Sequence, residues 1–316
     1  MTRRNSTRDR ASVSALGLLL AVATSVFGTG LVVQASSAAG TGKIAAVGAE
    51  NEYANVIGQI GGRYVTVAGI MSNPNTDPHT FEASPQVAQM VSAADLVVQN
   101  GLGYDAFMTK IEAASPNHRR KVIEVQDLLG LPSNTPNPHL WYKPTTMPAV
   151  AKAVAADLAA LAPAHAGYFQ TRAKQFDTSL TPWYGAIAQI KAKFPKAAVA
   201  TTEPVGDYLL QAVGADNRTP WPLQADIMNG VDPSPQVVTF QDDLFTRHQV
   251  KVFLYNRQVT NSLTASFLML AKQNGIPVVG VYETMPAPGY DYQTWMMAEA
   301  KALDRALADK RSTTRL

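Results

Sequence analysis

The sequence contains no cysteine among its 316 residues. This absence excludes disulfide bonds, thiolate metal ligands, cysteine nucleophiles and attachment to a membrane through a lipidated cysteine. Charged residues are also scarce, at 16%, but a hydrophobic fraction of 46% is ordinary for a globular chain. Residues 1–40 hold four arginines and one aspartate, so this segment alone accounts for the net charge of +3. The rest of the chain is close to neutral, so we expect no nucleic-acid partner.

Only one apolar run is long enough to span a membrane, at residues 15–33. It follows a basic start with Arg3 and Arg4, and it precedes small residues that include Ser37 and Ala39. A basic start, an apolar segment and a small-residue site are typical of a cleaved signal peptide. We therefore predict a signal peptide over residues 1–40 and a periplasmic or extracytoplasmic protein. An uncleaved N-terminal anchor is the alternative.

After this segment, short apolar runs alternate with amphipathic stretches. The runs predict strands at 43–49, 64–70, 96–100, 121–125, 198–203, 250–256 and 277–283. The stretches predict helices at 85–94, 106–114, 205–213 and 263–274. Strands that alternate with helices, and that are rich in Val, Ile and Ala, indicate parallel sheets with helices on both faces. The predicted fold class is α/β.

The middle of the chain has a different pattern. Residues 147–161 predict an Ala-rich helix, and residues 163–193 predict a longer one that Pro182 should kink or split. Because this segment separates two sets of strands and helices, we predict an N-terminal lobe at 41–162, a connecting helix at 163–195 and a C-terminal lobe at 196–316. We expect a last helix at 294–310 and a frayed tail after it.

The five histidines differ in their surroundings. His118 lies beside two arginines, and His165 and His248 fall on predicted helices without an acidic or histidine partner one turn away. These three are interpreted as structural. His79 and His139 each follow a proline in a connection before a helix. Proline stiffens the backbone beside the imidazole, which favours a preorganised metal ligand.

Two glutamates occupy matching places in the second half. Glu203 and Glu283 each close a predicted strand, and ligand sites in open α/β sheets lie at the carboxyl ends of strands. An isolated glutamate in such a place is more simply interpreted as an acid that stabilises the start of the following helix. Together with His79 and His139, however, they form a nitrogen and oxygen ligand set suited to a divalent first-row metal ion. Four separate segments would place that ion between two domains.

Five segments resemble those of the metal-specific solute-binding proteins of ABC importers (cluster A-I), a group with zinc binders, manganese binders and adhesin lipoproteins. They are Asp77-Pro78-His79 with Phe81-Glu82, Asn137 to Trp141, Thr202-Glu203-Pro204, Tyr255 to Gln258, and Glu283 to Pro286. The resemblance spans residues 43–310. It implies two α/β lobes joined by a long rigid helix, with the ion in the cleft. It also implies ligands at His79, His139, Glu203 and Glu283, with residues 255–258 as supporting structure.

The sequence departs from this family pattern in three ways. It lacks the lipid-anchor cysteine of many members, and it lacks the His-rich loop of many zinc-specific members. Glu283 also stands where the family often has an aspartate. Oxygen ligands favour manganese, whereas zinc binds most such sites more tightly, so zinc and manganese both stay open. We expect a monomer that delivers the ion to a membrane permease, and no enzyme activity.

Two other functions would use the same fold. A metal-dependent hydrolase could use the same four residues, but it needs a metal-bound water and a free general base. The sequence has no HExxH pair and no G-x-S-x-G elbow, and both glutamates are already assigned as ligands. The third possibility is an organic ligand stacked on Trp141, Trp183, Trp221 or Trp295. A ligand-induced thermal shift without metal would favour it.

Overall fold

The computed structural model describes residues 42–75, 77–286 and 288–316. The predicted signal peptide therefore lies outside the described residues. Within the described ranges, no helix combines the length and the apolar character needed to cross a bilayer.

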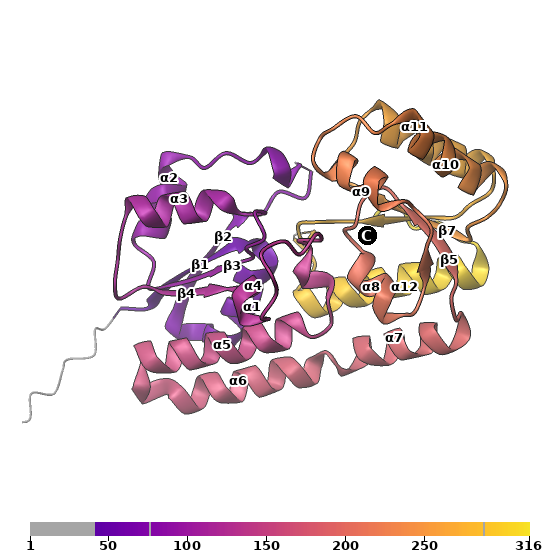
Figure 1. The fold of residues 1–316 in the computed structure, drawn as a ribbon. Helices are drawn as coiled ribbons and strands as arrows, with labels where there is room; N and C mark the ends of the chain where they lie inside the picture. The colour runs from indigo at the N-terminus through magenta and orange to yellow at the C-terminus, as the bar shows by residue number, and fades with distance from the viewer. Residues whose placement is uncertain (1–41, 76, 287) are drawn as a thin grey trace, which may run out of the picture. The chain divides into compact units, whose positions relative to one another are not determined.

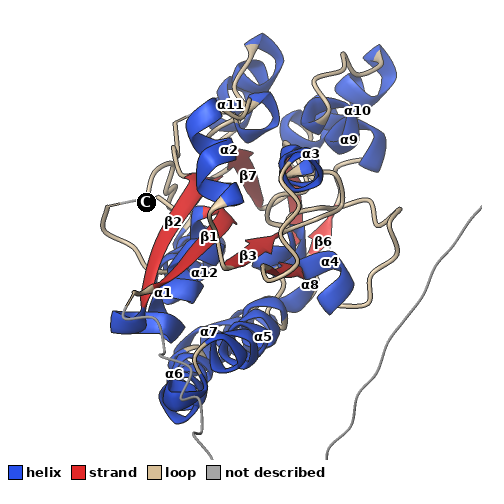
Figure 2. Cartoon of the chain, turned by 90° about the vertical axis from the view of Figure 1, so that its left-hand side faces the viewer, coloured by secondary structure: helices blue, strands red, loops and turns tan. Residues whose placement is uncertain are grey.

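The first sheet is parallel throughout, with strand order β2-β1-β3-β4. Its strands are β1 (Ile44–Glu50), β2 (Val65–Met71), β3 (Leu96–Gln99) and β4 (Lys121–Glu124). The accompanying helices are α1 (Asn51–Gly61), α2 (Pro85–Ser92), α3 (Ala106–Ala114), α4 (Val125–Leu128) and α5 (Thr146–Leu161). Alternate strand residues face opposite sides of a sheet. Val47 and Val97 accordingly pack with residues of α2 and α3, whereas Ala46 and Val98 pack with residues of α1 and α5. Helices α2 and α3 lie on one side of the sheet, and α1 and α5 lie on the other (Figures 1 and 2).

The second sheet repeats this arrangement, with order β6-β5-β7-β8 and all strands parallel. Its strands are β5 (Ala198–Thr201), β6 (Asp216–Asn217), β7 (Val252–Asn256) and β8 (Val278–Val281). Its helices are α8 (Asp207–Ala212), α9 (Trp221–Met228), α10 (Pro235–Thr246), α11 (Ser262–Gln273) and α12 (Tyr292–Asp309). The two-lobe α/β fold is confirmed. The two sheets share one strand order, although the sequence shows no repeat.

Two helices placed end to end link the two sheets. They are α6 (Ala166–Ser179) and α7 (Thr181–Lys193), and they run along both halves in Figure 1. The break at Leu180 follows from Pro182, which has no backbone N–H and fits the first turn of a new helix. Helix α6 packs on α1 and α5, whereas α7 packs on α8 and α12. The lobe boundaries at 41–162, 163–195 and 196–316 stay predictions.

The chain after α12 is ordered against the second sheet, so the predicted frayed tail is wrong. The Thr313 backbone N–H donates to the Val278 carbonyl (2.8 Å), and the Gly280 N–H donates to the Thr313 carbonyl (2.8 Å). Gly280 permits this pairing because a side chain there would collide with the backbone of Thr314. The edge of β8 would otherwise present unpaired backbone groups.

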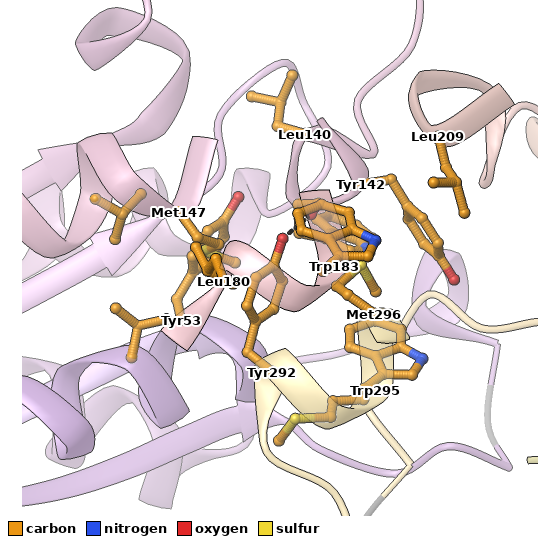
Figure 3. Packing of buried hydrophobic residues seen from close by; sticks show 14 of the residues in the cluster. Tyr53, Leu140, Tyr142, Met147, Leu180, Trp183, Leu209, Tyr292, Trp295 and Met296 are labelled. Carbon is orange, nitrogen blue, oxygen red and sulfur yellow. Dashed lines mark hydrogen bonds between the residues drawn. The ribbon is translucent and has the colours of Figure 1, made fainter. Parts of the chain in front are cut away.

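A buried aromatic cluster ties the second lobe to the segment after His139 (Figure 3). Tyr142, Trp183, Tyr292 and Trp295 are each at most 1% exposed. The Tyr292 hydroxyl donates to the Trp141 carbonyl oxygen at 2.6 Å. Large buried aromatic side chains contribute strongly to core stability. This cluster therefore fixes the backbone that positions one of the candidate ligands.

Candidate metal-binding site

His79 lies in a short 3-10 turn, Pro78–Thr80, that follows β2. The Asp77 carboxylate accepts a hydrogen bond from the His79 backbone N–H at 2.9 Å and so caps this turn. The His79 side chain is 24% exposed. It lines two hollows of about 470 and 380 Å³, the second of which also reaches Tyr104 and Trp221. Solvent therefore reaches the site at His79.

His139 is fully buried at the start of a second 3-10 turn, Leu140–Tyr142. Its Nδ1 lies 2.8 Å from Oδ1 of Asn137, which also accepts the His139 backbone N–H at 3.0 Å. An amide oxygen can only accept, so Nδ1 carries a proton, and in the neutral ring the Nε2 lone pair is then available to a metal ion. The Asn137 Nδ2 donates to the carbonyl oxygen of Pro204 at 2.8 Å. Asn137 thus joins His139 to the segment that carries Glu203.

Glu283 follows β8 and lies at the centre of the site. Its Oε2 is 3.3 Å from Nε2 of His79 and 3.3 Å from Nε2 of His139. The Tyr104 hydroxyl donates to the same oxygen at 2.9 Å. Among the described residues, ligand atoms of His79, His139 and Glu283 form a group within 4.8 Å of one another, the spacing of a metal site. The structure therefore brings three of the four predicted site residues into one cluster.

Glu203 follows β5, is 2% exposed and lies outside that three-residue group. Its Oε1 accepts a hydrogen bond from Asn256 Nδ2 at 3.2 Å, and the same amide donates to Glu283 Oε1 at 2.6 Å. Its Oε2 is buried without a hydrogen-bond partner among the described residues. A buried carboxylate oxygen without a partner is energetically costly. Glu203 is thus joined to the cluster through a shared amide and has one unused oxygen.

The ionisation of these groups is strongly perturbed. Burial alone would lower the pKa of His79, but the hydrogen bond and charge of Glu283 raise it overall. Burial lowers the pKa of the less accessible His139 despite the same carboxylate. Burial acts to raise the pKa of Glu283, yet hydrogen bonds from both histidines hold it far below its usual range. Burial, followed by the charge of Glu283, raises the pKa of Glu203.

The backbone from Glu283 to Met285 is held by two side-chain amides. The Gln258 Oε1 accepts the backbone N–H groups of Glu283 (2.7 Å) and Thr284 (2.8 Å). From the start of α1, the Asn51 side chain accepts the Met285 N–H and donates to the Met285 carbonyl, both at 2.9 Å. These paired bonds fix the direction in which Glu283 projects.

Sequence reasoning missed several residues around the candidate ligands. Tyr104 and Asn51 were not identified, and Asn137 was noted only as part of a segment that resembles the family, whereas residues 255–258 were expected to support the site. One signal was available for Tyr104, which follows the predicted strand at 96–100 and so lies at the same sheet edge as the ligands. Asn51 offered no such signal, because asparagine at a strand end most often caps a turn.

The other three histidines lie outside the cluster of His79, His139 and Glu283. The His165 ring stacks on Tyr64 with centroids 3.9 Å apart. His165 ends the 3-10 turn Pro163–His165, and His248 follows α10 with a positive φ of 52°. The predicted helical placement of His248 is therefore wrong.

Comparisons with known proteins agree with this architecture. Residues 47–306 match the family model described as periplasmic zinc-uptake complex component A, ZnuA. The chain belongs to this family. Its members are metal-binding solute-binding proteins of ABC importers and not enzymes, so the hydrolase alternative is not favoured.

Individual relatives are distant in sequence. The manganese-binding lipoprotein MntA of Bacillus subtilis is 22% identical over 273 residues, which cover 82% of this chain and 86% of the relative. The iron-binding protein YfeA of Yersinia pestis is 20% identical, covering 72% of this chain and 75% of YfeA. The structure of the periplasmic zinc-binding protein TroA of Treponema pallidum superposes with a TM-score of 0.72 at 18% identity. That superposition covers 84% of this chain and all of TroA.

Proposed function

We propose that this protein captures zinc or manganese at His79, His139, Glu203 and Glu283 and delivers the ion to the permease of an ABC importer. The observation that carries the proposal is the convergence of two imidazole Nε2 atoms on one carboxylate oxygen of Glu283. An ion there would replace the hydrogen bonds that now join these groups. It would also give the unused oxygen of Glu203 a partner.

The energetics favour a divalent cation. Glu203 and Glu283 are buried close to each other, and their mutual repulsion contributes to the raised pKa of Glu203. Two charges on the ion would balance two carboxylates, while neutral imidazoles supply the remaining donors. Three of the four side chains are buried, but His79 contacts solvent. This gives a site that retains an ion firmly and can still exchange it through one face.

Two opposing preferences bear on which ion the site would bind. Two carboxylates suit a harder ion such as manganese, whereas zinc binds histidine and carboxylate sites with higher intrinsic affinity. Relatives named for manganese, iron and zinc leave this choice open. We further propose that the protein works outside the cytoplasm as a monomer, exported by the signal peptide at residues 1–40 and without a cysteine anchor.

The direct test is the metal content of purified mature protein. The protein is stripped with a chelator, incubated with equal zinc and manganese, desalted and analysed by mass spectrometry. We expect about one ion per chain in the wild type and in His118→Ala, and none in His79→Ala or His139→Ala, because only these two lose a proposed ligand. Retention of neither metal by the wild type, or equal retention by all three variants, would refute the proposal.

A further inference from the structure

Asn256 ends β7 and is fully buried between the two glutamates. Its Nδ2 donates to Glu283 Oε1 at 2.6 Å and to Glu203 Oε1 at 3.2 Å. One amide therefore contacts one oxygen of each carboxylate.

The orientation of this amide is fixed by its surroundings. The Asn256 Oδ1 accepts the backbone N–H of Gln258 at 3.0 Å, so its donor end must face the glutamates. The Asn256 backbone N–H donates to the Thr202 hydroxyl at 3.0 Å, which also fixes the residue next to Glu203. Turning the amide over would break its bond to Gln258 and place an oxygen against two carboxylates.

Each glutamate consequently has one oxygen left for an ion. For Glu283 this is Oε2, which faces both histidines. The Tyr104 hydroxyl also donates to Oε2, but its proton can rotate toward another acceptor, whereas the Asn256 amide is held in place by Gln258. For Glu203 it is Oε2, which is buried without a partner in the described structure. With one Nε2 atom from each of His79 and His139, the site presents four donor atoms in total.

We infer that Asn256 is a specificity-determining residue that restricts Glu203 and Glu283 to one oxygen each and thereby favours four-coordinate zinc over manganese. Zinc sites are predominantly tetrahedral, whereas manganese is typical of octahedral, oxygen-rich sites. If both carboxylates could bind through two oxygens, the same four side chains would offer six donors. This inference rests on the proposed function and narrows its choice of ion.

The test compares the wild type with Asn256→Ala in zinc and manganese binding, measured by competition with a chelating dye. Gln241→Ala is the matched control. Gln241 is another fully buried amide of the same lobe, and it bonds to Thr201 and Thr219 rather than to a glutamate. We expect the zinc-to-manganese affinity ratio to fall about tenfold or more in Asn256→Ala, which is at least the effect of losing one of its two hydrogen bonds to charged groups. The ratio should be unchanged in Gln241→Ala.

A second measurement does not depend on the folding of the variant. The wild type loaded with Co²⁺ should show the intense visible absorption of four-coordinate cobalt. A weak absorption band, typical of six-coordinate cobalt, would overturn the inference even if metal binds tightly. An unchanged affinity ratio in a folded, metal-binding Asn256→Ala would also overturn it, while leaving the proposed function intact. Failure of the wild type to bind any of the three ions would instead refute both.

Discussion

Glu299 on α12 is a buried acid that connects the core to the site. It is 1% exposed, and its Oε1 accepts hydrogen bonds from Trp295 Nε1 and the Tyr142 hydroxyl, both at 3.2 Å. The Tyr142 hydroxyl shares its single proton with the carbonyl oxygen of Tyr282, which lies 2.9 Å away and directly before Glu283. Burial raises the pKa of Glu299 from its ordinary value of 4.5 to about 8, although both hydrogen bonds oppose this.

This raised pKa makes the stability of the fold depend on pH. Between pH 4.5 and about 8, the folded state keeps a proton that the unfolded state has released. The free energy of unfolding contributed by Glu299 is therefore complete below pH 4.5 and is lost as the pH rises through this window. One pKa unit corresponds to about 1.4 kcal/mol, so the loss between pH 5 and pH 7.5 amounts to roughly 3 kcal/mol.

Glu299→Gln should remove this dependence, because glutamine stays neutral and keeps an oxygen acceptor. Urea unfolding at pH 5 and pH 7.5, with chelator present, gives the difference in unfolding free energy between variant and wild type. That difference should shift by about 3 kcal/mol in favour of the variant at the higher pH. The exposed Glu82→Gln serves as the control and should show no such shift. A difference for Glu299→Gln that is constant to within about 0.5 kcal/mol would refute the reasoning.

Three further predictions follow from the structure. Deleting residues 311–316 removes the backbone hydrogen bonds between Thr313 and β8. The free energy of unfolding, measured by urea titration, should fall by about 2 kcal/mol. An unchanged free energy would contradict a stabilising role for the tail. Acidification from pH 7.5 to 5.5 should weaken metal binding, measured by calorimetry, about tenfold or more. The reason is that Glu283 raises the pKa of His79, so protons compete with the metal for its ring. Equal affinities at the two pH values would contradict histidine ligation. Asn137→Ala should weaken zinc binding about 10- to 100-fold in chelator competition, because His139 loses the acceptor that orients it; wild-type affinity would contradict this.

The sequence predicted the fold well wherever burial dictates composition. Strands buried on both faces need contiguous apolar residues, so the predicted runs lie close to seven of the eight strands. The exception is β6, a two-residue strand of Asp216 and Asn217 that pairs with β5 through its backbone. The pairing of Thr313 with the β8 edge was missed for the same reason. Backbone pairing at an edge leaves little trace in side-chain composition.

The candidate site was predicted in part. His79, His139 and Glu283 were identified because their chemistry and their positions beside strand ends or prolines are visible in the sequence, and the structure brings them together. The contacts of Tyr104 and Asn256 with Glu283 depend on convergence from different lobes and strands. No local pattern encodes such convergence. The roles of His79, His139, Glu203 and Glu283 as ligands stay predictions.

The most direct test of the central claim is a crystal structure of the mature protein loaded with zinc, with the ion located by anomalous scattering. We predict one ion at about 2.0–2.2 Å from Nε2 of His79, Nε2 of His139, Oε2 of Glu203 and Oε2 of Glu283. An ion bound elsewhere, or one that these histidines do not ligate, would contradict the account.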